Sequence, residues 1–110
     1  MKDYDDTPMF EDTLAANFTM ESMRQIAQET QTKYIREKYE SILWQIQIAA
    51  ENRRFATTFP ASECPLELVS WLLKQDFKIV WEVKQTGAHI VIHAANEYIE
   101  ADAKSVTVAW

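Results

Sequence analysis

The feature that most constrains this chain is residues 20–52, 33 residues that contain neither glycine nor proline. Apolar residues recur within it at spacings of three and four, which is typical of an amphipathic helix. One unbroken helix of this length would span roughly 50 Å, whereas a globule of about 100 residues is only about 35 Å across. We therefore expect part of the helix to project beyond its own domain and to need a partner.

The start and the two faces of this helix can be predicted. Thr19 is placed to cap it, and Phe18 and Met23 have the spacing of a hydrophobic staple. The first half carries the stripe Met20, Met23, Ala27, Thr30 and Tyr34. The second half carries the stripe Ile35, Tyr39, Ile42, Ile46 and Ala49. We expect the second stripe to pack on the protein's own sheet and the first to form a coiled-coil-like contact between subunits. The alternative is a break near Gln31 and Thr32, with the chain folding back as two shorter helices.

Charge is distributed unevenly along the chain. Residues 1–21 contain one lysine against six acidic residues, a net charge of −5, while the whole chain carries −6. The rest is nearly neutral, so direct nucleic-acid binding is not expected, because such affinity depends on neutralising phosphates. We interpret residues 1–18 as an acidic N-terminal arm that contacts a neighbouring subunit through Met9, Phe10 and Leu14; a disordered tail is the alternative.

The remaining residues predict a small sheet with one more helix. Residues 54–59 read as a strand, and a helix capped by Ser62 or Cys64 is expected from Pro65 to about Gln75. Its inward residues are predicted to be Leu66, Val69, Leu72 and Leu73. Strands follow at 77–85, 89–94 and 105–110, with an acidic loop or short helical turn at 96–103. A turn at Thr86-Gly87 pairs Val83 with Ile90, Trp81 with Ile92 and Ile79 with Ala94.

The predicted fold class is therefore α+β. A long N-terminal helix and one short helix pack on a small, mostly antiparallel sheet of three to four strands. Residues 19–110 form a single domain from which the helix 19–52 projects.

Few residues favour catalysis. Four residues along a strand separate His89 and His93 by about 13 Å, too far to share a metal ion, so no metal site is expected. A nucleophilic Cys64 would need one of those histidines as its base, although its place near a helix start could lower its pKa. One glycine in the chain excludes phosphate-binding loops. We expect no enzyme and no cofactor.

Two other groups of residues are candidates for binding. Arg53 and Arg54, after the long helix, could hold an anion, or they simply complement the negative end of the helix dipole. Of the four tryptophans, Trp44 departs from the Ile42 and Ile46 stripe and is the first candidate for an interface, with Trp71 similar. The alternative is that all four are core residues.

The layout from Ile42 onward also has a counterpart. A helix ending in Ile-x-x-Ala-Ala, a strand, a Leu-rich helix, a strand and a final strand ending in Trp occupy 46–50, 55–59, 66–73, 77–83 and 106–110. This order resembles small uncharacterised accessory and structural proteins of tailed phages and large DNA viruses. Those proteins usually have glycine after the first helix and before the second strand, where this chain has Asn52 and Asp76. The resemblance implies a viral source and carries over no activity.

These observations favour a non-enzymatic, homo-oligomeric phage or viral protein. We expect a small structural or virion-associated component, located in the virion or the host cytoplasm and not in a membrane. Its partners would be copies of itself, other viral structural proteins or a host protein. The alternative is an oligomeric anti-defence factor, either a sponge for a nucleotide signal or an acidic inhibitor of a host nucleic-acid enzyme.

Overall fold

The computed structural model describes residues 18–110. The predicted contacts of Met9, Phe10 and Leu14 lie outside these residues. The described residues divide into two compact units, one that ends at Tyr34 and one that spans Ile35–Trp110. None of the described helices is long and apolar enough to cross a bilayer.

The predicted single helix is wrong, because the structure divides it at Tyr39. Helix α2 (Met20–Lys38) is followed by helix α3 (Glu40–Glu51). Tyr39 between them is not helical: its backbone angles are φ −115° and ψ 33°. The Tyr39 hydroxyl donates a hydrogen bond to Glu67, which lies 28 residues away in the chain. This contact ties the side chain to another helix, so the break falls here and not near Gln31. The predicted start is confirmed, since Oγ1 of Thr19 accepts a hydrogen bond from the Ser22 N–H at 3.0 Å.

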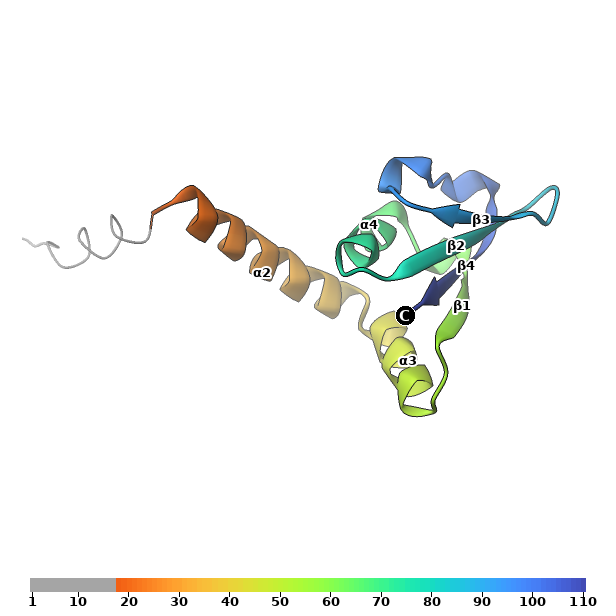
Figure 1. Ribbon diagram of the computed structural model, residues 1–110, viewed down its shortest axis with the longest axis horizontal. Helices are drawn as coiled ribbons and strands as arrows, with labels where there is room; N and C mark the ends of the chain where they lie inside the picture. Colours follow the sequence, from red (N-terminus) through yellow and green to blue (C-terminus); the bar gives the residue numbers. More distant parts are fainter. Residues whose placement is uncertain (1–17) are drawn as a thin grey trace, which may run out of the picture. The chain divides into compact units, whose positions relative to one another are not determined.

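Four antiparallel strands form the sheet (Figure 1). They are β1 (Ala56–Pro60), β2 (Lys78–Val83), β3 (His89–Ile92) and β4 (Ala103–Ala109), in the spatial order β1-β4-β2-β3. The last strand in sequence therefore lies in the middle, between β1 and β2. Helices packed on this sheet give the α+β fold that the sequence predicts.

The β2–β3 hairpin forms, but its predicted register is wrong by two residues. Trp81 lies opposite Ile90, and Ile79 lies opposite Ile92. The Val83 N–H donates to the Ala88 carbonyl at 2.8 Å, so four residues, 84–87, form the loop, with Gly87 at φ +71°. A shift of two leaves every side chain on the same face, because faces alternate with a period of two. The facing pattern was therefore predictable although the turn length was not.

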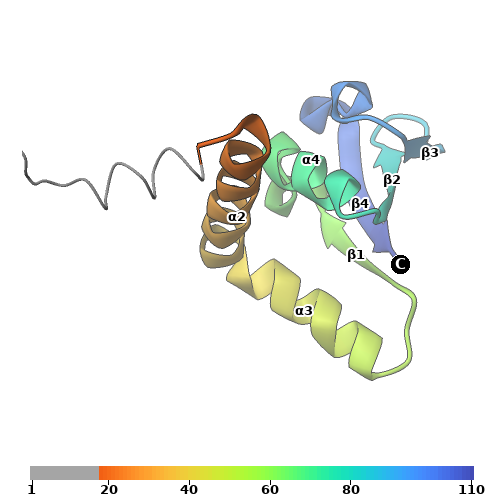
Figure 2. The same cartoon turned by 60° about the vertical axis from the view of Figure 1, so that its left-hand side comes forward.

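One face of the sheet and two helices build the core. The inward residues of the sheet are Phe59, Ile79, Trp81, Ile92, Val106 and Val108. Helix α3 contributes Ile42 and Ile46, and helix α4 (Leu66–Lys74) contributes Leu68, Val69, Trp71 and Leu72. Figure 2 shows α3 and α4 as separate helices that lead into β1 and β2. The predicted inward Leu66 is wrong, since it is 44% exposed; Leu68 and Trp71 are buried instead, because they lie on the same arc of the helix as Val69 and Leu72.

The start of α4 is held from a distance. Neither Ser62 nor Cys64 caps it. The N-cap residue is Pro65, whose side chain makes no capping hydrogen bond. Instead, Oε2 of Glu100 accepts a hydrogen bond from the Leu66 N–H at 2.7 Å. Glu100 belongs to the acidic connector, where the structure has two short 3₁₀ turns, Ala95–Glu97 and Glu100–Asp102. A carboxylate at the positive end of a helix is favourable, so the connector helps to hold α4 in place.

Two residues after the last residue of α3 and of α4 comes a residue with positive φ that is not glycine. Arg53 has φ 64° and Asp76 has φ 68°. After α3, the Arg54 N–H donates to Ala49 and the Arg53 N–H to Ala50; after α4, the Phe77 and Asp76 N–H groups bond in the same pattern. This is the Schellman motif, which glycine usually completes because it lacks a Cβ. Each helix therefore ends at a fixed residue and turns directly into the next strand.

Candidate functional site

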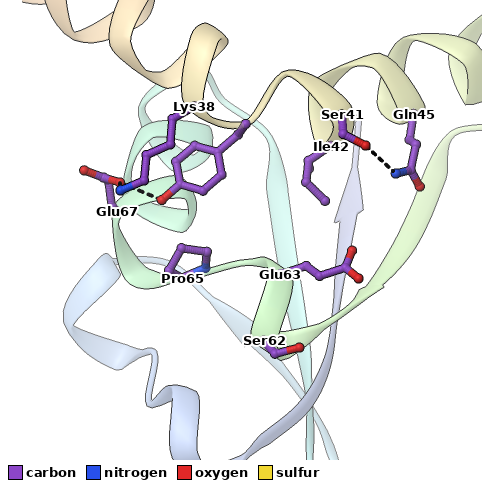
Figure 3. Close-up of a pocket in the computed structure, with 9 residues that line it drawn as sticks. Lys38, Ser41, Ile42, Gln45, Ser62, Glu63, Pro65 and Glu67 are labelled. Carbon is purple, nitrogen blue, oxygen red and sulfur yellow. Dashed lines mark hydrogen bonds and ion pairs between the residues drawn. The ribbon is translucent and has the colours of Figure 1, made fainter.

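Four regions are candidates for a functional site. They are a surface groove, the exposed faces of α2 and α3, and the end of the sheet where Phe55, Phe77 and Trp110 lie. The groove has a volume of about 700 Å³ and lies between the start of α3, the 3₁₀ turn Ala61–Glu63 and the start of α4. It is lined by Lys38, Tyr39, Ser41, Ile42, Gln45, Ser62, Glu63, Pro65 and Glu67. Figure 3 shows Lys38 and Glu67 together at one side and Glu63 at the other. Its wide opening makes it a surface groove and not an enclosed cavity.

A small polar network lies at one side of this groove. Oε2 of Glu67 accepts hydrogen bonds from the Tyr39 hydroxyl at 2.6 Å and from Nζ of Lys38 at 3.1 Å. Burial raises the pKa of Tyr39, and the bond to Glu67 raises this pKa further. Lys38 and Glu67 remain partly exposed, so their ion pair contributes little to stability. The network mainly fixes where α2 stops and α3 begins.

Cys64 is not an activated nucleophile. Its side chain is fully buried, and burial, with a smaller effect of Glu63, raises the pKa of the thiol to about 12. The lowering of this pKa that a nearby helix start could give does not occur, because desolvation dominates. The Cys64 carbonyl instead accepts a hydrogen bond from the Tyr98 hydroxyl at 2.8 Å, a structural contact.

The histidines lie at the β3 end of the sheet. His89 begins β3, and His93 follows its last residue. Within residues 18–110, no three His, Cys, Asp or Glu side chains are grouped so that they could hold a metal ion.

The predicted stripe on α2 is exposed along its length. Met20 is 71% exposed, and Met23 and Tyr34 are also exposed, as are Ala27 and Thr30. Ile26, which the stripe omitted, is exposed beside Met23. Ile35 is the one buried residue of the whole helix. The structure thus leaves an apolar helix face uncovered within the part of the chain that it describes.

The two candidate tryptophans have opposite environments. Trp44 is 62% exposed, whereas Ile42 and Ile46 on either side of it are buried, so Trp44 lies on the outer face of α3. Trp71 is only 8% exposed and belongs to the core, so its assignment to an interface is wrong. The α4 core arc is wide enough to include Trp71 together with Leu68 and Leu72.

A third apolar feature was missed by the sequence reasoning. Phe55, Trp110 and Phe77 lie side by side across the end of β1, β4 and β2; we call these three residues the aromatic row. The Trp110 N–H donates to the Phe55 carbonyl at 3.0 Å, and the Trp110 and Phe77 rings meet edge to face at 6.4 Å. Only the strand register reveals this row, since the three residues are far apart in sequence.

Arg53 and Arg54 lie beside this row. Both are exposed, and both follow the end of α3 immediately before Phe55. Their position suits the negative end of the helix dipole, and it also places two cations next to an exposed aromatic ring. The predicted anion-binding pair is therefore exposed and adjacent in sequence to the exposed Phe55.

Comparison with known proteins adds no relative: no family model, no curated protein and no solved structure matches this chain.

Proposed function

We propose that this protein is a non-enzymatic, self-assembling component whose helix α2 contacts a second copy. The observation that supports the proposal is the exposed stripe of Met20, Met23, Ile26 and Ala27 on a helix that buries only Ile35. Most helical stability in proteins comes from packing of an apolar face and not from intrinsic helix propensity. A partner that covers the stripe would supply that packing.

The spacing of the stripe favours a coiled-coil contact. Met20, Met23, Ala27, Thr30 and Tyr34 alternate steps of three and four, as in positions a and d of a heptad. Lys33 and Lys38 then occupy flanking g and e positions, which would face each other in a parallel, in-register pair. Lys38 is already paired with Glu67 at 3.1 Å, however, so these two lysines do not decide between parallel and antiparallel pairing.

Five stripe positions on one helix form only a short seam. Stable interfaces usually bury about 1,200–2,000 Å² in total, so further contacts must add to it. The exposed Trp44 is the first candidate for such a contact, because exposed tryptophans are enriched at interfaces.

Light scattering tests this proposal directly. We expect the wild-type protein to have a mass well above the 12.8 kDa of one chain. Met20→Ser/Met23→Ser should lower that mass, because it removes the apolar surface of the seam. Leu66→Ser, at an exposed apolar position on α4, is the matched control and should leave the mass unchanged. A wild-type protein of single-chain mass at micromolar concentration would contradict the proposal.

The biological setting is proposed from the sequence resemblance. We propose a small structural or virion-associated phage or viral protein, present in the virion or the host cytoplasm. Mass spectrometry of purified particles should find it in many copies per virion. Its absence from the particles would remove the virion component and leave a role in the infected cell.

One observation favours the second candidate, an oligomeric sponge for a nucleotide signal. The exposed Phe55 ring beside Arg53 and Arg54 combines a stacking surface with two phosphate-binding groups. Thermal shift with cyclic and linear nucleotides should then show stabilisation that Arg53→Ala/Arg54→Ala abolishes. If no nucleotide shifts the melting temperature, this candidate is wrong.

A further inference from the structure

The aromatic row becomes more exposed from β2 toward β1. Phe77 is half-buried, Trp110 is 38% exposed, and Phe55, before the edge strand β1, is 73% exposed. Registers of Ala56 and Lys78 with Ala109 place the three rings in successive strands of one row. Large aromatic side chains gathered in this way are typical of interaction surfaces, where they supply much of the binding energy.

Four basic residues adjoin this row in sequence. Arg53 and Arg54 precede Phe55, Lys74 ends α4, and Lys78 follows Phe77; all four are exposed. Two exposed acidic residues lie among them, Glu51 at the end of α3 and Asp76 next to Phe77. The grouping arises because two helices end here, and basic residues are favourable at the negative end of a helix dipole. This end of the sheet therefore carries exposed aromatic residues and an excess of basic over acidic residues, which fits an acidic segment that carries apolar side chains.

We propose that residues 3–14 of a second copy bind at this aromatic row, an inference that rests on the proposed self-assembly. Residues 1–17 contain one lysine against five acidic residues, a net charge of −4. Within them, Met9 and Phe10 are adjacent apolar residues between acidic ones, so the composition matches both properties of the surface. The row would pack against Met9 and Phe10 while Arg53 and Arg54 face the carboxylates of Asp5 and Asp6.

This contact differs in kind from the α2 seam. A seam between identical helix faces is self-complementary and closes a pair, whereas an arm on another surface is heterologous. Charge complementarity in such a contact mainly sets specificity and association rate, and it weakens with salt. The arm would thus supply the additional contact area that the short seam lacks.

Photo-crosslinking in the full chain tests the proposal. A photoreactive benzophenone amino acid replaces Phe10 in unlabelled protein, which is mixed with ¹⁵N-labelled protein before irradiation. We expect cross-links from the unlabelled arm to labelled peptides that contain Phe55, Phe77 or Trp110. Cross-links only within one isotope form, cross-links to α2, or no cross-links would each overturn the proposal.

Charge reversal supplies the matched controls. Arg53→Glu/Arg54→Glu in the labelled copy, which supplies the row, should reduce the cross-link yield at least tenfold. Asp5→Arg/Asp6→Arg in the unlabelled copy, which supplies the arm, should restore it. Lys84→Glu, an exposed lysine in the hairpin loop at the other end of β2, should leave the yield unchanged. Circular dichroism confirms that each variant is folded. An unchanged yield in the double arginine variant would overturn the proposal.

Light scattering of the same samples separates the two possible failures. A multimer that shows no cross-link to the row rejects the arm contact and keeps self-assembly. A single-chain mass rejects self-assembly, and the arm contact with it.

Discussion

Two regions of this protein cover their apolar side chains in different ways. In the unit Ile35–Trp110, Leu68, Leu72, Ile79, Val106 and Val108 are fully buried in one core. In the unit that ends at Tyr34, none of the described residues is buried, and Met20, Met23 and Ile26 are exposed. One sequence can thus specify a self-sufficient core and, next to it in the chain, a helix whose apolar face stays exposed.

Truncating one large side chain in each region gives the largest expected contrast. Leu72→Ala should lower the free energy of unfolding by about 3 kcal/mol, because it leaves a cavity in a packed core. Met23→Ala should change it by less than about 0.5 kcal/mol in dilute protein, where the side chain is exposed. Urea unfolding at low protein concentration measures both. Equal losses would show that α2 is already covered within one chain.

The two helix starts sharpen the comparison. Glu100→Ala should cost about 1 kcal/mol of global stability, since it removes the carboxylate that bonds the Leu66 N–H from 34 residues away. Thr19→Ala removes a cap of similar kind from α2, but it should reduce helical circular dichroism without changing the urea midpoint. A lowered urea midpoint in the Thr19 variant would show that α2 unfolds together with the core, which would contradict the comparison.

Replacing a positive-φ residue after a helix of the packed region by glycine should raise stability. Arg53→Gly should raise the free energy of unfolding by about 0.5–1 kcal/mol, because a Cβ is unfavourable at its φ of 64°. Arg54→Gly is the matched control, since Arg54 is absent from the residues with positive φ, and it should give no gain. Differential scanning calorimetry compares the two. A gain in both variants, or in neither, would contradict the strain assigned to Arg53.

The smallest expected effect is the loss of stability that Glu97 causes as the pH falls. Oε1 of Glu97 accepts hydrogen bonds from the His93 and Ala94 N–H groups at 2.5 and 3.0 Å, and these bonds lower the pKa of Glu97 below its usual 4.5. A lowered pKa means that the carboxylate stabilises the fold above pH 4.5 and that this stabilisation is lost as the pH falls further. Glu97→Gln should therefore lower the melting temperature at pH 7 and have progressively less effect toward pH 3. A difference that stays constant with pH would contradict this role.

Much of the fold was predictable because alternation and helical spacing are local signals. The sheet faces followed from residues such as Ile79 and Val106, and they survived a hairpin register that was wrong by two. The break at Tyr39 was not predictable, because its hydrogen bond partner is Glu67, 28 residues away. The same holds for Glu100 at the start of α4. Long-range polar contacts leave no periodic pattern in a sequence.

Some candidate surfaces were likewise predictable from local spacing, and others only from the folded sheet. The exposure of Met20 and Trp44 follows from helical spacing, although their part in an interface remains a prediction. The aromatic row required the order β1-β4-β2, which places Phe55 beside Trp110 only after the sheet has formed. Trp71 was assigned wrongly because a departure from a narrow stripe does not reveal how wide the buried arc of α4 is.

We propose that α2 is covered only when copies associate. Amide hydrogen exchange measured at two protein concentrations, 100-fold apart, tests this most directly. We expect protection of residues 20–34 to rise with concentration, while protection of α4 stays the same because α4 is covered within one chain. Protection of α2 that does not depend on concentration would contradict the account.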